Sequence, residues 1–465
     1  MGSEQNPLLV SKIGIIGAGI SGIAAAKELR AYKPFVFEAT DSIGGVWKHC
    51  SYNSTKLQSL RCDYEFSDYP WPERDNMNFP SHLEILEYLH SYANHFDVMK
   101  LIHFNTKVVE IRLVRDRETI DYGTLLPGQP VWKVAVKTNQ SETLEWYAFE
   151  FLVICIGKYG DIPKMPEFPQ NKGPEVFKGK VMHSLEYCKL DKEAATELVR
   201  GKKAIVVGYK KSGIDLAMEC AEANQGPEGQ PCTMVKYAVS KFVESYLTWK
   251  LPLDKYGLRP EHPFLEDYAS CQMAILPENF FEEADKGTIR FKRAFKWWFW
   301  DGGIEFEDNT KLEADIVFLS TGFDGKKKLK TILPEPFRSL LEYPSGLMPL
   351  YRATIHPLIP NMAFVGYIES VANLHSAELR CKWLSGLMDG LFKLPSVEKM
   401  LEDTTKEIKV MKSTTRFYKR HCISTYSINH DDEICEDMGW ASWRKKSWIA
   451  ELFSPYTSQD YEEHK

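Results

Sequence analysis

The sequence predicts an α/β fold of two doubly wound units, one of them inserted in the other. Three observations support this prediction. At residues 12–22 and 201–217, a buried-type strand leads into a glycine-containing turn and then into a good helix former. Further continuous apolar runs, such as FLVICIG, are typical of buried parallel strands. Helical segments such as SHLEILEYLHSYANHF alternate with these strands, which indicates an open parallel sheet in each unit.

The first turn follows a predicted strand at residues 13–16 and has the spacing G-x-G-x-x-G. The first glycine makes a tight turn, and the second lets the backbone approach a pyrophosphate. The third lets helix and strand pack closely, with the helix N-terminus facing the anion. We therefore expect a Rossmann-like dinucleotide site formed by Gly17, Ala18, Gly19, Ile20, Ser21 and Gly22.

Two features after this turn strengthen the prediction. A second strand, PFVFE, ends in Glu38, about 20 residues after the turn, where an acid hydrogen-bonds ribose hydroxyls. The turn Gly44-Gly45-Val46-Trp47 then resembles the GGxW extension of flavoproteins that bind two dinucleotides. Gly45, Val46 and Trp47 are therefore expected at the same cofactor, and the alternative is a tight turn with a core tryptophan.

The second turn follows a predicted strand at residues 204–207 but departs from the glycine pattern. Lysine occupies the position of the second glycine, and its side chain limits how closely a pyrophosphate approaches, although Lys210 and Lys211 bring positive charge. Near the end of the next strand, Lys236 is the cation available for a 2′-phosphate, and no arginine is present. The expected nicotinamide site consists of Gly208, Tyr209, Lys210, Lys211, Ser212 and Gly213.

Two later strands complete the predicted architecture. DIVFLSTGF at 315–323 and NMAFVGYIE at 361–369 are nearly continuously apolar, as buried parallel strands are. The first domain is therefore expected to comprise residues 1–190 and 326–465, with the second domain at 191–325 inserted in it.

Composition excludes several classes of protein. Lys+Arg 58 against Asp+Glu 64 gives a net charge of -6, which argues against nucleic acid as a partner. No apolar run approaches the roughly 20 residues of a membrane helix, so no stable membrane anchor is expected. The 10 cysteines include no C-x-x-C pair, which favours reduced thiols over a disulfide frame or a zinc site. These features predict a soluble cytoplasmic protein without a metal site.

The connection between the two turns contains Phe177, Gly179, His183 and Tyr187, spaced F-x-G-x-x-x-H-x-x-x-Y. Composition gives about 0.004 accidental matches to this pattern with Tyr or Phe at its end. The motif and its position resemble the identifying sequence of the flavin-containing monooxygenases. Baeyer–Villiger relatives end the motif in Trp, so Tyr187 favours the branch that oxygenates nitrogen or sulfur.

The chain is more similar to plant members of this family, over about residues 10 to 461. STKLQSLRCDYEFSDYPWP, KLEADIVFLSTGFDGKKKLK, ESVANLHSAELRCKWLSG and FSPYTSQDY resemble plant segments. The resemblance implies an FAD-binding first domain and an NADP-binding inserted domain. It also implies NADPH and molecular oxygen as co-substrates, with a small-molecule amine or thioether as the oxygen acceptor, through a C4a-hydroperoxyflavin. A slight preference goes to an amine or amino-acid nitrogen.

Chemistry of this kind resides in the cofactor, so no catalytic triad or metal cluster is needed. In STKLQS, Gln58 falls where animal and bacterial members carry an asparagine close to the flavin. Gln58 is thus the candidate catalytic residue, because an amide donates a hydrogen bond without titrating. The alternative is a polar residue that points at solvent or backbone. For His183, a structural role is favoured over proton transfer.

Two other functions stay open. A flavin-binding protein with impaired NADPH use is consistent with Lys210, with Gln58, and with Tyr237 in place of a 2′-phosphate arginine. A flavin-dependent disulfide reductase shares the architecture but needs a redox dithiol, which the absence of C-x-x-C disfavours. The region 240–290, expected to shape the substrate pocket, contains no readable chemical motif.

Overall fold

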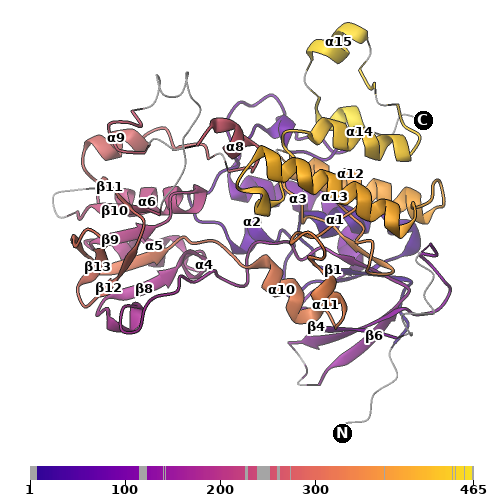
Figure 1. Ribbon diagram of the computed structural model, residues 1–465, viewed down its shortest axis with the longest axis horizontal. Helices are drawn as coiled ribbons and strands as arrows, with labels where there is room; N and C mark the ends of the chain where they lie inside the picture. The colour runs from indigo at the N-terminus through magenta and orange to yellow at the C-terminus, as the bar shows by residue number, and fades with distance from the viewer. Residues whose placement is uncertain are drawn as a thin grey trace.

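The computed structural model contains two sheet-bearing units that lie side by side (Figure 1). Residues 226–228 and 238–251 lie outside the described structure, and so do the side chains of Lys236 and Tyr237. The region 240–290, expected to shape the substrate pocket, is therefore described only from residue 252 onward, with gaps. The described residues are 8–114, 123–139, 141, 143–225, 229–237, 252–258, 262–272, 274–370, 372–441, 443–445, 447–454 and 456–462.

The first unit is built on a parallel sheet in the order β16-β7-β1-β2-β3. Every residue of β1 and β7 is buried, which explains their continuous apolar sequences. The strands predicted near residues 13, 35 and 361 are confirmed. The strand bounds are β1 Ile13–Ile16, β2 Phe35–Phe37, β3 Ile102–His103, β7 Phe151–Ile154 and β16 Met362–Phe364.

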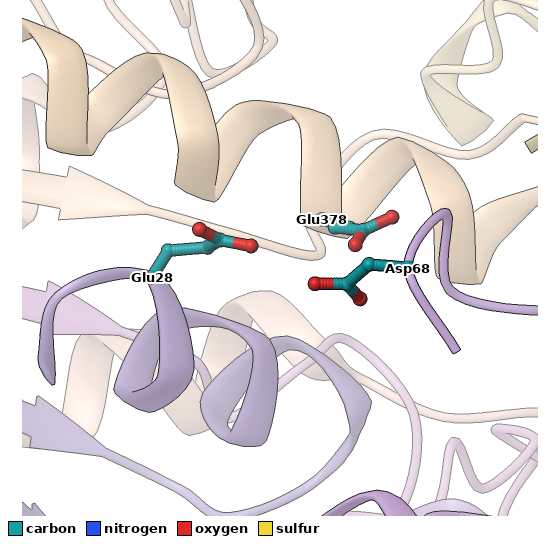
Figure 2. Close-up of side chains that lie close together, drawn as sticks. All are labelled: Glu28, Asp68 and Glu378. Atoms are coloured by element: carbon teal, nitrogen blue, oxygen red, sulfur yellow. The ribbon is translucent and has the colours of Figure 1, made fainter. Parts of the chain in front are cut away.

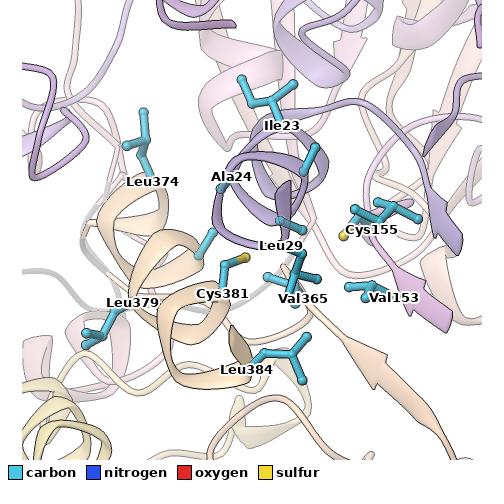
Figure 3. Close-up of a cluster of buried hydrophobic side chains, with 14 of the residues drawn as sticks. Ile23, Ala24, Leu29, Val153, Cys155, Val365, Leu374, Leu379, Cys381 and Leu384 are labelled. Atoms are coloured by element: carbon cyan, nitrogen blue, oxygen red, sulfur yellow. The ribbon is translucent and has the colours of Figure 1, made fainter. Parts of the chain in front are cut away.

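Helices α1 (Ile20–Glu28) and α12 (Asn373–Met388) pack against each other beside this sheet, as Figure 3 shows. The small side chain of Ala24 on α1 lets the two helices approach closely, and Cys381 and Leu384 of α12 are completely buried. The end of the chain therefore returns to the first unit. Its other helices are α2 Val46–His49, α3 His82–His95, α10 Gly325–Ile332, α11 Phe337–Leu340, α13 Val397–Thr414, α14 Ser427–Asp437 and α15 Trp448–Phe453.

The second unit has its own parallel sheet, in the order β11-β10-β9-β15-β8. Strands β9 and β15 are buried throughout and confirm the strands predicted at 204–207 and within 315–323. The strands are β8 Lys180–His183, β9 Ala204–Val207, β10 Cys232–Tyr237, β11 Ile289–Ala294 and β15 Ile316–Leu319. The helices are α4 Ser184–Tyr187, α5 Lys192–Val199, α6 Lys211–Ala223, α8 Phe264–Tyr268 and α9 Phe280–Asp285.

Two small antiparallel sheets accompany the parallel ones. One of them lies low on the right of Figure 1 and comprises β4 Thr106–Leu113, β5 Trp132–Thr138 and β6 Glu145–Phe149. The other comprises β12 Trp297–Trp300, β13 Gly303–Phe306 and β14 Lys311–Glu313.

The predicted α/β fold with an inserted second unit is confirmed, because strands of the first sheet both precede and follow the second sheet in the chain. Strand β8 pairs with β15, so the second sheet takes one strand from before residue 191. The division into domains at 190/191 and 325/326 stays a prediction.

The expectation of ten reduced thiols is wrong for two of them. Cys271 and Cys422 form a disulfide, although 151 residues separate them in the chain. This pairing joins a loop of the second unit to the C-terminal part of the first unit, a contact that no local sequence spacing signals. The other eight cysteines, all within the described residues, are free.

Candidate functional site

The first glycine turn joins β1 to α1. Gly17 has a φ of +102°, a left-handed conformation that strains residues with a Cβ. A Cβ on Gly22 would lie 1.8 Å from the Gly17 carbonyl oxygen. The chain's own geometry therefore requires the first and third glycines.

Gly19 lies in a different environment. A Cβ there would meet no described atom nearer than the Gly45 Cα at 3.7 Å, which is ordinary contact. Gly19 is the N-cap of α1, and Ile20 and Ser21 lie in the first helical turn. In the described residues, no side chain caps this helix and no acidic residue lies in its first turn. The absence of a side chain at Gly19 and the uncapped helix N-terminus fit a pyrophosphate, as in bound FAD.

Glu38 follows β2, and its buried carboxylate is fixed beside the first turn. Oε2 accepts a hydrogen bond from Ala18 N at 2.7 Å. Oε1 accepts hydrogen bonds from Thr40 N at 2.9 Å and from Thr40 Oγ1 at 2.7 Å. These donors orient the carboxylate and leave lone pairs that can accept hydrogen bonds from ribose hydroxyls.

The Gly44–Trp47 turn approaches the same place. Gly44 N donates to the Ala18 carbonyl at 3.2 Å, and Gly45 has a φ of +54°. Helix α2 begins at the exposed Val46, and Trp47 Nε1 donates to the Tyr64 hydroxyl at 2.8 Å. The structure thus brings together the three segments that the sequence predicts for one cofactor.

The second turn joins β9 to α6 and repeats two of the three glycine requirements. Gly208 has a φ of +131°, and a Cβ on Gly213 would lie 2.5 Å from the Gly208 carbonyl oxygen. Tyr209 is half-buried and Ser212 is exposed. Beside the turn, the buried Ser320 hydroxyl has no hydrogen-bond partner among the described residues, so it can bond to a polar ligand group.

The two lysines of this turn contact different parts of the molecule. Lys210 is the N-cap of α6, and its ammonium donates to the Gln272 carbonyl oxygen. Lys211 pairs with the buried Asp215 at 2.6 Å, four residues along the helix. Lys210 is therefore the lysine directed away from its own helix.

Crowding around the Lys210 ammonium lowers its pKa to about 8, mainly through desolvation, although part of its side chain is exposed. Arg420 and Lys164 lower the pKa further, while Glu369 and Asp267 oppose this shift. Lys210 thus loses much of its charge just above neutral pH.

Gln58 lies at the boundary between the units. Its Oε1 accepts a hydrogen bond from Ile275 N at 3.0 Å. Because a backbone N–H only donates, the atom that faces it is the carbonyl oxygen, and the amide NH₂ is directed elsewhere. Gln58 is exposed and can donate through that NH₂ group.

Sequence reasoning missed Glu219 of α6. Its Oε1 accepts hydrogen bonds from Ser54 N at 2.9 Å and from Ser54 Oγ at 2.7 Å. Its Oε2 accepts one from the Tyr187 hydroxyl at 2.9 Å. One carboxylate therefore joins the segment that carries Gln58 to the end of the F-x-G-x-x-x-H-x-x-x-Y motif.

The remaining motif residues form the connection itself. Phe177 packs on Phe299 with ring centroids 5.8 Å apart, and a Cβ on Gly179 would lie 2.4 Å from the Asp315 carbonyl oxygen. His183 is buried, and its Nδ1 accepts a hydrogen bond from Leu185 N at 3.1 Å, which caps α4. Desolvation lowers the pKa of His183, so its ring is neutral near pH 7.

A charged cluster at the carboxyl ends of β7 and β16 was also missed. Glu369 is buried and binds Lys158 Nζ at 2.7 Å and Arg420 Nη2 at 2.8 Å. Tyr159 donates to the same carboxylate. Burial alone would raise the pKa of Glu369, but Lys158 and Arg420 have the larger combined effect and lower this pKa. Charged residues directly after two predicted parallel strands were the available signal.

Glu28, Asp68 and Glu378 converge from three segments (Figure 2), the only such acidic group in the described residues with metal-ligand spacing. Lys27 Nζ already lies 2.6 Å from Glu28 and 2.5 Å from Asp68. Burial raises the pKa of Glu378 to about 7, which disfavours its charged form at neutral pH. Lys382 Nζ lies 3.7 Å from Glu378, so these carboxylates already have side-chain cations as partners.

Within the described residues, no helix combines the length and apolar character needed to cross a membrane.

Known sequences match nearly all of this chain. Residues 10–226 and 231–443 match the family described as flavin-binding monooxygenase-like. A probable flavin-containing monooxygenase 1 of Arabidopsis thaliana is 56% identical and covers 99% of this chain and 98% of its own length. A putative flavin-containing monooxygenase 2 of the same plant is 59% identical over 94% of this chain and 99% of its own length.

Solved structures share the fold. An S-allyl-L-cysteine S-oxygenase from Allium sativum superposes with a TM-score of 0.62 at 20% identity, covering 92% of this chain and 88% of that one. An open form of cyclohexanone monooxygenase gives a TM-score of 0.65 at 16% identity, covering 92% and 98%. At these identities the likeness concerns the fold alone.

Proposed function

The chain belongs to the flavin-binding monooxygenase-like family, and on this premise we propose that it is an NADPH- and O2-dependent monooxygenase. Its substrate is a small molecule with a nucleophilic nitrogen or sulfur, which receives one oxygen atom. The observation that carries the flavin-binding part of this proposal is Gly19, where a Cβ would make only ordinary contact, so the chain's own packing does not require a glycine. Such a position is explained by a ligand.

FAD would be held by the first turn, by Glu38 and by residues 45–47. The uncapped N-terminus of α1 would receive the pyrophosphate, and the Glu38 carboxylate would receive the ribose. Bound FAD supplies the electron transfer and the activation of oxygen. The residues of the chain bind and orient the reactants and exclude water.

The nicotinamide nucleotide would lie at the second turn, residues 208–213. Here the Lys210 ammonium would bind a phosphate in place of the close backbone approach that a second glycine permits. The Ser320 hydroxyl lies beside this turn and is available as a further hydrogen-bonding group.

Gln58 would donate a hydrogen bond through its amide NH₂ at the boundary between the two units. Ile275 N fixes the carbonyl end of the side chain, so the donor end is the one left for reactants. An amide serves here over a wide pH range because it does not titrate.

For the oxygen acceptor we propose an amine, including an amino-acid nitrogen, slightly ahead of a thioether. We also propose that the protein works in the cytoplasm, a compartment that suits its eight free cysteines. Cell fractionation tests the location.

The function is tested with purified, FAD-loaded protein under anaerobic conditions. NADPH should bleach the flavin, and subsequent oxygen with a panel of amines and thioethers should give a product with one added oxygen atom. An intact flavin spectrum after NADPH addition contradicts the proposal and favours a flavin-binding protein with impaired NADPH use. Lys210 at the second glycine position is the observation that supports this alternative.

A flavin-dependent disulfide reductase is the third candidate function. The Cys271–Cys422 disulfide is the structural feature that supports it. Cys422 pairs through its backbone with Glu369, in the segment that follows β16. The reductase predicts that NADPH alone reduces this disulfide anaerobically through the flavin. The monooxygenase predicts that the disulfide survives NADPH while the flavin is bleached.

A further inference from the structure

A strap from the second unit crosses to the first unit and contacts both candidate sites. We define it as residues 266–272 and 274–275, which begin within α8. The Cys271–Cys422 disulfide ties it covalently to the C-terminal part of the first unit. Cys422 is almost fully buried, and Cys271 is partly exposed. A reductant can therefore approach the bond from the Cys271 side.

The first half of the strap is docked without help from the disulfide. The Glu266 carboxylate binds the Arg416 guanidinium in a bidentate pair, with contacts of 2.9 and 3.1 Å. Arg420 Nε donates to the Ser270 carbonyl at 2.8 Å, and Ser424 Oγ donates to the Tyr268 carbonyl. This half is held by several independent bonds.

The second half of the strap has fewer contacts, and two of them involve the candidate site residues. The Gln272 carbonyl oxygen accepts from the Lys210 ammonium, while its amide nitrogen donates to Ser270 Oγ at 2.7 Å. Ile275 N donates to Gln58 Oε1. The disulfide lies between the docked half and this site-facing half.

Cys271 itself has an unfavourable backbone conformation. Its φ is +50°, in the left-handed region that residues with a Cβ rarely adopt. Such a conformation persists where surrounding bonds impose it. The disulfide is the bond at this residue that can be removed chemically.

We propose that Cys271–Cys422 is a thiol–disulfide modification site that acts as a latch on the proposed nicotinamide site. Closed, the latch keeps Gln272 on Lys210 and Ile275 on Gln58. Its reductant is a dithiol: the Cys271–Cys422 bond breaks, each sulfur gains one electron and one proton, and the dithiol becomes a disulfide. No atom of the flavin takes part in this exchange.

Reduction opens the latch locally. Residues 266–270 stay docked through Arg416 and Arg420, while Gln272 and Ile275 leave the two candidate side chains. Lys210 then turns to the phosphate of the nucleotide, and NADP⁺ affinity rises about tenfold, the lower end of the value of one charge-assisted hydrogen bond. This consequence rests on the proposed function, whereas the opening itself does not.

The first measurement locates the latch. FAD-loaded protein is treated either with a mild thiol oxidant or with dithiothreitol, and the cysteine pairing is mapped by mass spectrometry of peptides. Hydrogen exchange is then compared between the two forms. The latch predicts a Cys271–Cys422 peptide in the oxidised form. On reduction it predicts faster exchange at residues 271–272 and 274–275 but unchanged exchange at 266–269. Absence of the cross-linked peptide, or equal exchange in both forms, overturns it.

The second measurement uses variants and NADP⁺ binding by calorimetry. Cys271→Ser should bind NADP⁺ like the reduced protein whether oxidant is present or not. Gln272→Ala should give the oxidised protein the same higher affinity without breaking the disulfide. Cys62→Ser, at a free and half-buried cysteine, is the matched control and should keep the redox response. A redox response that persists in Cys271→Ser contradicts the latch.

These measurements distinguish failure of the proposed NADPH use from failure of the proposed latch. If neither redox form binds NADP⁺, the proposed NADPH use fails, while hydrogen exchange still decides whether the latch exists. If both forms bind NADP⁺ with equal affinity, the proposed function stands and the coupling of the latch to Lys210 is wrong.

Discussion

The two glycine turns of this chain have the same backbone course but differ at one residue. In both, the first glycine has a positive φ and the third lies against the carbonyl of the first. Gly19 in the first turn is not needed for packing, and the second turn carries Lys210 at the matching position. The difference separates the glycines that the fold requires from Gly19, which the proposed function assigns to a ligand.

In the proposed function, the replaced glycine changes how an anion is bound at the second turn. A backbone cradle acts through N–H groups that do not titrate, whereas a lysine acts through a charge that other side chains can modify or hold. Lys210 is held by Gln272 of the strap. The second turn is thus open to control through the strap in a way that the first turn is not.

The largest effect is expected from filling the glycine positions that the fold requires. In Gly22→Ala, the new Cβ would lie 1.8 Å from the Gly17 carbonyl, and in Gly213→Ala it would lie 2.5 Å from the Gly208 carbonyl. Because both contacts are with backbone, we expect a loss of about 3 kcal/mol or more in unfolding free energy. Denaturant unfolding measures this loss. Wild-type stability in either variant would refute the shared requirement.

The next effect concerns the carboxylate that joins the two units. Glu219→Ala removes the acceptor for Ser54 and Tyr187, and we expect about 2 kcal/mol of destabilisation. Glu222→Ala on the same helix is the control, because Glu222 is exposed and should change stability by less than about 0.5 kcal/mol. Equal melting temperatures for the two variants would show that the Glu219 contacts contribute nothing.

A smaller effect is expected from removing the charge of Lys210. Lys210→Met keeps the length of the side chain and, in reduced protein, should weaken NADP⁺ binding about tenfold, since a charge-assisted hydrogen bond is lost. FAD content should not change. Lys192→Met, at an exposed position at the start of α5, is the matched control for loss of one positive charge. Unaltered binding in Lys210→Met would leave the second turn without its proposed anion contact.

The smallest effect is a pH dependence. The pKa of Lys210 is about 8 in the latched structure, so the ammonium is charged below that pH and neutral above it. In oxidised protein, where Gln272 holds Lys210 and only the charge of the lysine acts on the phosphate, NADP⁺ affinity should fall as the pH rises from about 7 to about 9, by less than about tenfold. Lys210→Met should show no such fall. Arg420, Glu369, Asp267 and Lys164 surround the group, and an affinity that rises with pH would assign the titration to one of them.

The parts of the site that follow local rules could be predicted from the sequence. The first turn and Glu38 depend on spacings of a few residues after a recognisable strand, and the structure places them together. The sheets follow from continuous apolar runs. The departure at Lys210 was also visible, because a lysine simply occupies the second glycine position.

Contacts between distant segments could not be predicted in the same way. Glu219 binds a segment 165 residues earlier in the chain, and Cys271 pairs with a cysteine 151 residues away. Nothing in their immediate sequence marks either contact, since both depend on how the two units meet. The charged residues after β7 and β16 were readable as a strand-end pattern, but their pairing with Arg420 was not.

The most direct test of FAD binding beside Gly19 is the variant Gly19→Ala, with FAD content and thermal stability measured on the same preparation. In Gly19→Ala, the protein without FAD should melt at the wild-type temperature, because the added Cβ meets no described atom nearer than 3.7 Å. The amount of FAD retained by the variant should fall at least tenfold, because the Cβ occupies space needed by the bound cofactor. Full FAD content in a stable Gly19→Ala protein would show that no ligand occupies the space beside Gly19, and would contradict FAD binding at the first turn.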